Sequence, residues 1–182
     1  MARRVSRGGR RTAVQGLGAT TTTCSPLPGA ETRVCITRPA KRTKVHTADD
    51  ACTLLRRARN ADRESFYVLA LDPQNQVQGV EEIARGSVGD VAVHPREAFK
   101  TAVMLNASAV IIAHNHPSGS PVPSELDVDL TKRFVEAGKL LGIPVIDHLI
   151  VGQSGCGSIA DVDPMVLRGA RRPARRYRIR RR

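Results

Sequence analysis

The segment AVIIAHNHPSGSPVPSELD, residues 109–127, places an apolar run, a proline-rich loop and a helix start in immediate succession. Its first five residues are apolar on both alternating faces, which is typical of a strand covered on both sides. Ser124 and Asp127 have the S-x-x-D spacing of a capping box, and an apolar helical periodicity follows them. The segment therefore predicts a buried strand that leads through a loop into a helix.

The chain before this segment is predicted to form a helix, two antiparallel strands and a second helix. A T-x-x-D pattern opens the first helix, and a D-P-Q-N turn joins the two strands. A proline at the first helical position opens the second helix. The predicted ranges are 48–59, 65–71, 76–83 and 95–106.

The chain after this segment continues the alternation. Gly142 ends the predicted helix, and VIDHLIV at 145–151 predicts another buried strand. One apolar stripe is expected to face the core. The stripe comprises Leu126, Leu130, Phe134, Ala137 and Leu141. Strands interleaved with helices at these lengths predict an α/β fold, a three-layer αβα sandwich with a mixed sheet.

Charge is divided unevenly along the 182 residues, which carry a formal net charge of +12. Residues 1–44 and 168–182 each carry +9, whereas residues 45–167 carry −6. Both ends are poor in core-forming residues, and like-charge blocks of this kind usually lack a packed fold. We therefore expect a basic N-terminal segment at 1–44 without regular structure, a folded domain at 45–160 and an arginine-rich tail at 161–182.

The basic ends allow two interpretations. They could bind the phosphates of nucleic acid non-specifically, with an affinity that falls steeply as salt rises, or they could be solvated ends without a partner. No apolar run reaches membrane-spanning length, and the arginine-rich start lacks the apolar block of a secretory signal. The sequence therefore predicts a cytoplasmic protein without a membrane partner. The cysteines have no C-x-x-C spacing, which predicts reduced thiols at Cys24, Cys35, Cys52 and Cys156.

Two histidines of the opening segment are candidate metal ligands. His114 and His116 lie two positions apart on an extended stretch, so both rings point to the same side. Asp127 adds a carboxylate at the third position of the next helix. Two imidazoles, one carboxylate and an open fourth position form the catalytic type of zinc site. A capping box of Ser124 and Asp127 needs no metal, but the two interpretations are compatible, because a hydroxyl can accept one hydrogen bond and still donate another.

The joint pattern resembles a known family. H-x-H, seven residues, S, two residues and D is the signature of the JAMM metalloproteases of the MPN domain, and His114, His116, Ser124 and Asp127 satisfy each spacing. The runs HPREAFKTAVMLNASAVIIAHNHPSG, PSELD and LLGIPVIDHLIVG resemble the RadC-type bacterial members, a group usually named as DNA repair proteins. This resemblance covers residues 45–160.

The resemblance implies a fold related to cytidine deaminases and a zinc-dependent hydrolase. It implies that His114, His116 and Asp127 hold Zn²⁺. It assigns the general base to Glu64 and the stabilisation of the oxyanion to Ser124 together with the metal. The implied reaction is hydrolysis of a peptide or isopeptide amide, with a peptide or protein of unknown identity as the partner.

Four further residues carry weaker expectations. His94 is expected to be a helix cap or a surface residue and not a ligand. His148 is expected to be an interior histidine that donates a hydrogen bond. Asp147 is expected to accept a hydrogen bond from a metal-bound imidazole, because it lies in the D-H-x-I run of the family. His46 receives no role.

The chain also departs from the family it resembles. Longer RadC-type proteins carry a helix-hairpin-helix-like segment before the metal domain, and residues 1–44 lack that periodicity. We therefore expect a short form. An alternative function is a DNA-associated repair or recombination accessory that binds nucleic acid through its basic tails. A nucleobase deaminase is disfavoured, because the H-x-E and P-C-x-x-C elements of that chemistry are absent.

Overall fold

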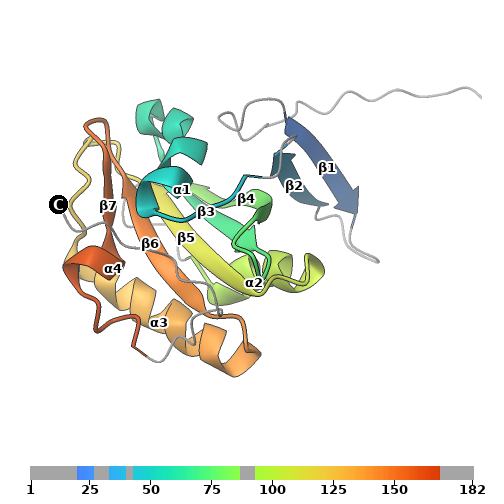
Figure 1. Ribbon diagram of the computed structural model, residues 1–182. Coiled ribbons are helices and arrows are strands. Elements are labelled where there is room, and N and C mark those ends of the chain that lie inside the picture. Colours follow the sequence, from blue (N-terminus) through green and yellow to red (C-terminus); the bar gives the residue numbers. More distant parts are fainter. Residues whose placement is uncertain (1–19, 27–32, 40–42, 87–92, 169–182) are drawn as a thin grey trace, which may run out of the picture.

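The computed structural model describes residues 20–26, 33–39, 43–86 and 93–168. Its centre is a seven-stranded sheet in the order β1-β2-β4-β3-β5-β6-β7. The strands are β1 Thr20–Pro26, β2 Arg33–Pro39, β3 Glu64–Leu71, β4 Val77–Gly86, β5 Ala109–Asn115, β6 Val145–Val151 and β7 Cys156–Ser158. The helices are α1 Ala48–Leu54, the 3₁₀ helix η1 Arg56–Asn60, α2 Pro95–Met104, α3 Glu125–Leu141 and α4 Ile159–Val162. Figure 1 shows the β1–β2 hairpin at one edge of the sheet and β7 at the other.

The sheet is mixed, as the sequence predicts. β5 and β6 are parallel and α3 connects them, whereas the other neighbouring strands pair antiparallel. A parallel pair needs a crossover of this kind, because a tight turn cannot join strands that run in the same direction. The β5–α3–β6 unit brings the end of β5 beside the start of α3.

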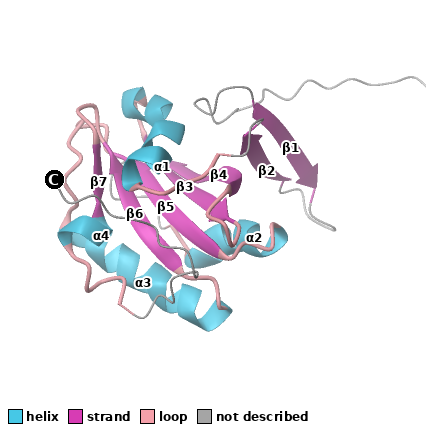
Figure 2. Cartoon of the chain, viewed as in Figure 1, coloured by secondary structure: helices cyan, strands magenta, loops and turns pink. Residues whose placement is uncertain are grey.

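Two apolar clusters cover the two faces of the sheet. Alternate residues of β5 divide between them, with Ile111 and Ala113 on the face of α1 and η1, and Val110 and Ile112 on the face of α2 and α3. Every residue of β5 is buried, which explains why its sequence is apolar on both faces. Figure 2 shows helices beside the strands of this sheet, and the three-layer α/β arrangement agrees with the sequence prediction.

The buried face of α3 differs from the predicted apolar stripe. Leu126 is 76% exposed, and Leu141 is also exposed, whereas Asp127 and Thr131 are buried. The complete buried set of this helix is Asp127, Thr131, Phe134, Val135 and Gly138. Polar residues therefore occupy the first two turns of the inner face, where the helix passes the candidate site. The helix ends as predicted, with Gly142 at φ 69° in the left-handed region that glycine adopts without strain.

The expectation of reduced thiols is wrong for Cys24, Cys52 and Cys156, which are all disulfide-bonded, and Cys52 and Cys156 are joined to each other. This bond joins α1 to the first residue of β7 across a sequence separation of 104 residues. The next residue, Gly157, lies against the proline-rich loop, and a Cβ there would stand 2.0 Å from the carbonyl oxygen of Pro121. The disulfide therefore anchors the strand on which the loop of the candidate site rests.

Other boundaries differ from the sequence predictions in detail. The first helix is α-helical only over α1 and continues as η1. Residues 20–26 and 33–39 form the β1–β2 hairpin, although the N-terminal segment was expected to lack regular structure. Strand β7 and helix α4 follow β6, and α4 extends past residue 160, where the folded domain was expected to end. The arginines after residue 168 lie outside the described residues. Among the described residues, no helix is long and apolar enough to span a membrane.

Candidate metal centre

Three predicted ligands converge where β5 ends and α3 begins. The Nε2 atoms of His114 and His116 lie 2.9 Å apart. The carboxylate of Asp127 places Oδ1 3.1 Å from Nε2 of His114 and Oδ2 3.5 Å from Nε2 of His116. His114 and Asp127 are buried and His116 is half-buried, and the three form a group that could hold a metal ion.

The spacing of these atoms fits a tetrahedral ion. Ligand atoms at about 2.0–2.2 Å from a zinc ion stand roughly 3.3–3.6 Å from one another in a tetrahedron. The three separations of 2.9, 3.1 and 3.5 Å are close to that geometry. All three atoms present lone pairs to one another when the imidazoles are protonated at Nδ1, and a shared cation stabilises such an arrangement. The donor set of two imidazoles and one carboxylate is the type that zinc prefers in catalytic sites.

The capping box and the metal ligand are the same carboxylate. Oδ2 of Asp127 accepts from the backbone N–H of Ser124 at 2.7 Å, and Oγ of Ser124 accepts from the backbone N–H of Asp127 at 3.2 Å. The Ser124 hydroxyl also donates to Oδ2 at 2.7 Å. These bonds leave Oδ1 facing His114. The cap thus orients the candidate ligand, and the capping interpretation drawn from the sequence is confirmed.

The same contacts set the ionisation of the site. Burial opposes the charge on Asp127, but the adjacent imidazoles of His114 and His116 and the hydroxyl of Ser124 outweigh it and hold the pKa of the carboxyl well below its usual range. The hydrogen bond with Asp127 raises the pKa of His116, against the opposing effect of burial. Asp127 is therefore an anion at neutral pH, as a metal ligand must be.

Glu64 stands beside this group at the first position of β3. Its Oε1 lies 4.0 Å from Nε2 of His114, and its side chain is 24% exposed. The buried side chain of Asn115 fixes the backbone on both sides of it. Oδ1 of Asn115 accepts from the N–H of Ser65 at 2.9 Å, and Nδ2 donates to the carbonyl of Arg63 at 3.0 Å. The last backbone pair between β3 and β5 is Phe66 with His114. Beyond that pair, the side chain of Asn115 supplies the hydrogen bonds that link the two strands.

The residue behind the ligands is His148 and not Asp147. Both oxygens of Asp147 accept from the Ser158 hydroxyl at 2.9 Å, and Oδ1 also accepts from the N–H of Ala160 at 3.2 Å. These contacts hold the start of α4, and none of the described hydrogen bonds joins Asp147 to a ligand imidazole. Nε2 of His148 instead lies 2.9 Å from Nδ1 of His114. The expectation for Asp147 is therefore wrong.

Two further histidines lie away from the centre. Nδ1 of His94 accepts from the backbone N–H of Arg96 at 3.2 Å at the start of α2, which confirms the predicted cap. His46 is exposed before α1.

Sequence reasoning missed Asn115 and Thr131. The first lies between the two ligand histidines and the second lies four residues after Asp127, and these positions are the local signals that could have found them.

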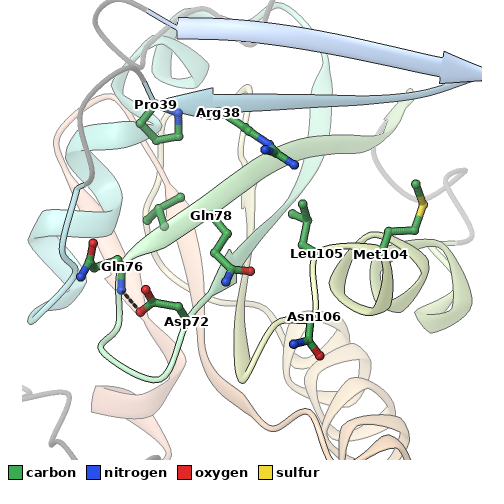
Figure 3. Close-up of a pocket in the computed structure, with 9 residues that line it drawn as sticks. Arg38, Pro39, Asp72, Gln76, Gln78, Met104, Leu105 and Asn106 are labelled. Carbon is green, nitrogen blue, oxygen red and sulfur yellow. Dashed lines mark hydrogen bonds between the residues drawn. The ribbon is translucent and has the colours of Figure 1, made fainter.

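A pocket of about 450 Å³ lies at the other end of β3, between β2, the β3–β4 turn and the end of α2. Figure 3 shows Arg38, Asp72, Gln78 and Asn106 among its lining residues. Asp72 accepts from the backbone N–H of Gln76 at 2.8 Å, which stabilises the turn. The residues that line this pocket include no histidine or cysteine, so the ligand chemistry lies at the opposite end of the strand.

Comparison with known proteins shows the family of the folded domain. A family model described as "RadC-like JAB domain" matches residues 45–163. The chain belongs to this RadC-like JAB family. Relatives include a UPF0758 protein of Moorella thermoacetica, 46% identical over 113 residues that cover 62% of this chain and 49% of the relative. A UPF0758 protein of Symbiobacterium thermophilum is 51% identical over 98 residues, which cover 54% of this chain and 42% of the relative.

The comparison identifies the family of this domain, and it does not extend over the full length of the relatives. The chain spans about half the length of the curated relatives that it matches. The matched range, 45–163, contains β3 to β7 and every residue of the candidate metal centre. The JAB domain family includes hydrolases, and the His-His-Asp group fits a metal site of the JAMM type.

Proposed function

We propose that this RadC-like JAB domain is a zinc-dependent hydrolase that cleaves a peptide or isopeptide amide with an activated water. The observation that carries the proposal is the convergence of His114, His116 and Asp127 beside a fourth residue, Glu64, whose Oε1 lies 4.0 Å from Nε2 of His114. Three ligands leave one tetrahedral position open, and a carboxylate next to that position is the general base that water activation requires.

His114, His116 and Asp127 would hold the ion. Zn²⁺, when bound, supplies Lewis acidity that lowers the pKa of a coordinated water from about 15.7 toward about 7 and polarises an amide carbonyl. Glu64 accepts a proton from the attacking water and returns it to the leaving nitrogen. Asn115 holds the backbone of Glu64 from both sides and so fixes where that carboxylate starts. Ser124 orients Asp127 through its hydroxyl, and its donation to an oxyanion requires that this hydrogen bond be exchanged.

The test combines metal analysis with amide cleavage. The wild-type protein is expected to hold one zinc ion per chain and to cleave members of a peptide and isopeptide library, read by mass spectrometry. Glu64→Gln is expected to keep the zinc and to lower kcat by about 10²- to 10⁴-fold, because it removes the general base. Glu125→Gln is the matched control, since Glu125 is an exposed carboxylate at the start of α3. Cleavage by Glu64→Gln at the wild-type rate, or a wild-type protein that takes up no zinc, contradicts the proposal.

A second candidate function rests on the charge distribution. The two ends each carry +9 around a body of −6, which favours a DNA-associated repair or recombination accessory that binds phosphates through the ends. This function predicts DNA affinity that falls linearly on a log–log scale with salt, at a slope of about −0.9 per phosphate contacted. Glutamine in place of the nine arginines of residues 168–182 should flatten that slope, whereas His116→Ala should leave it unchanged. An unchanged slope in the glutamine variant contradicts it.

A further inference from the structure

We propose that His148 and Thr131 select the ring tautomer of His114 that leaves its Nε2 free for the metal ion. The inference deepens the proposed function, because it concerns the same metal centre. It makes His148 and Thr131 positioning residues, which act through His114 and do not touch the metal or the substrate. The argument rests on the direction of three hydrogen bonds in a buried row.

The direction of the row is fixed at its far end. Oγ1 of Thr131 lies 2.5 Å from the carbonyl oxygen of Asp127 and donates its one hydrogen there, because a carbonyl can only accept. The same oxygen lies 2.6 Å from Nδ1 of His148. With its hydrogen already used, the hydroxyl accepts, so Nδ1 of His148 carries a proton.

The direction then passes to the ligand. A neutral imidazole that is protonated at Nδ1 presents a lone pair at Nε2. Nε2 of His148 lies 2.9 Å from Nδ1 of His114 and accepts a hydrogen from it. His114 is therefore protonated at Nδ1, and its Nε2 lone pair points toward His116 and Asp127. The other tautomer of His114 would put a hydrogen where the metal binds.

The other candidate histidine ligand, His116, has a simpler partner for its Nδ1 than His114 has. Nδ1 of His116 lies 3.0 Å from the carbonyl oxygen of Ser120, an acceptor that fixes its tautomer directly. His114 lies inside the sheet, where the strand carbonyls are used in pairing, and a neighbouring imidazole takes the place of that carbonyl. An imidazole can donate or accept at Nε2, so it fixes a tautomer only if its other nitrogen is itself fixed. Thr131 supplies that second constraint.

Burial makes the row depend on protein groups alone. His114 is 1% exposed, and His148 and Thr131 are fully buried, so solvent does not offer alternative partners. Packing also fixes the rings. Phe66 is stacked on His114 with an interplanar angle of 4° and also contacts His148, with ring centroids 5.6 Å apart. A flipped ring of His114 would lose both the hydrogen bond and the approach to Asp127.

The first measurement reads the tautomers directly. Long-range ¹H–¹⁵N correlation spectra of the histidine rings in the metal-free, wild-type protein are expected to show His114 and His148 protonated at Nδ1. His148→Phe keeps an aromatic ring of similar size but removes the acceptor, and it should yield a mixture of tautomers at His114. A wild-type spectrum in which Nε2 of His114 carries the proton overturns the inference. This reading does not depend on zinc uptake or on catalysis.

The second measurement is zinc affinity by competition with a chromophoric chelator. Loss of a partner that orients a metal ligand typically weakens binding by about 10- to 100-fold. We expect about that loss in His148→Phe and about tenfold in Thr131→Val, which is isosteric but lacks the hydroxyl. Thr131→Ser should restore wild-type affinity. Thr101→Val is the matched control, because this buried hydroxyl of α2 binds Glu81 and not the metal centre.

The outcomes separate this inference from the proposed function. Wild-type zinc affinity in both His148→Phe and Thr131→Val overturns the inference and leaves the hydrolase intact. A wild-type protein that takes up no zinc contradicts the hydrolase, and the ring spectra still decide the tautomer. If His148→Phe fails to fold, the comparison of Thr131→Val with Thr131→Ser carries the affinity test. A loss in Thr101→Val equal to that in Thr131→Val indicates general destabilisation and also overturns the inference.

Discussion

Two buried carboxylates of this protein, Asp127 at the start of α3 and Glu81 on β4, are each 8% exposed and yet ionise in opposite ways. The pKa of Asp127 is held well below its usual range, because donors outweigh burial. Burial raises the pKa of Glu81 to about 7, with a lowering effect of Lys100 and a raising effect of Glu97. Exposure alone therefore does not tell which buried acid is charged.

The difference lies in the donors that face each group. Asp127 receives hydrogen bonds from the hydroxyl and the backbone N–H of Ser124 and lies beside the imidazoles of His114 and His116. Glu81 lies between the sheet and α2 and receives a hydrogen bond from the neutral hydroxyl of Thr101. A carboxylate loses its hydration on burial, and only several directed donors replace it. The imidazoles beside Asp127 are also the other candidate ligands of the proposed metal, so the acid that stays charged is the one at the candidate metal centre.

The largest expected effect tests the charge of Asp127. Asp127→Asn keeps an oxygen for the cap at Ser124 but removes the anionic ligand. Because loss of an outer partner alone weakens binding by about 10- to 100-fold, loss of the ligand should weaken zinc affinity by about 1,000-fold, or about 4 kcal/mol. The measurement is chelator competition at neutral pH.

Glu81→Gln is the control for that experiment, since it neutralises an acid of equal exposure that contacts Thr101 of α2. Its zinc affinity should match that of the wild type. Equal losses in the two variants would remove the contrast between the two acids and would point to a general effect of charge.

The second effect concerns stability and Glu81. A carboxyl whose pKa rises from 4.5 to about 7 on folding stabilises the native state below pH 4.5, and that contribution is lost as the pH rises to about 7. Glu81→Gln mimics the protonated acid and escapes this loss. Its free energy of unfolding should equal that of the wild type near pH 4.5 and exceed it above pH 7, by about 3 kcal/mol at most. Urea titrations across this range measure the difference.

Glu82→Gln is the matched control on the same strand. Its side chain is 20% exposed and forms an ion pair with Arg85 at 2.8 Å, so it does not share the desolvation of Glu81. Glu82→Gln removes this ion pair and should therefore not gain stability over the wild type, in contrast to Glu81→Gln above pH 7. A pH-independent effect of Glu81→Gln would show that Glu81 is charged in the folded protein, as Asp127 is.

The sequence predicted the residues of the candidate metal centre better than their surroundings, for a physical reason. His114, His116, Ser124 and Asp127 lie within one strand–loop–helix unit, so strand alternation and helix capping placed them together without knowledge of the rest of the fold. The element order and the mixed sheet followed from hydrophobic periodicity in the same way. Glu64 lies fifty residues before His114 and came only from the resemblance to a family.

Contacts between distant segments were beyond these local rules. The disulfide of Cys52 and Cys156 closes 104 residues, and spacing motifs describe only nearby cysteines. The inner face of α3 was misjudged because two polar residues, Asp127 and Thr131, are buried next to the candidate site, whereas periodicity assigns buried positions to apolar residues. His148 was expected to be an interior donor, but its neighbour His114 became apparent only from the pairing of β5 with β6.

The smallest expected effect separates capping from ligand orientation. The chain contains two capping boxes, Ser124 with Asp127 on α3 and Thr47 with Asp50 on α1. Loss of an N-cap hydroxyl costs about 1 kcal/mol of stability, so Ser124→Ala and Thr47→Ala should lower the free energy of unfolding by similar amounts. Only Ser124→Ala should also weaken zinc affinity, by about tenfold, because its hydroxyl holds Oδ2 of Asp127 at 2.7 Å.

Comparison of Ser124→Ala with Thr47→Ala shows whether the serine hydroxyl only caps α3 or also orients Asp127 for the ion. If Ser124→Ala loses stability but binds zinc as the wild type does, the backbone N–H of residue 124 and the imidazoles suffice to orient Asp127, and the serine hydroxyl is only a cap. If Thr47→Ala weakens zinc affinity as much, the effect passes through stability and not through the carboxylate. A tenfold loss confined to Ser124→Ala shows that its hydroxyl orients the carboxylate of Asp127 for the ion, because the two helix starts are otherwise capped by the same pair of hydrogen bonds.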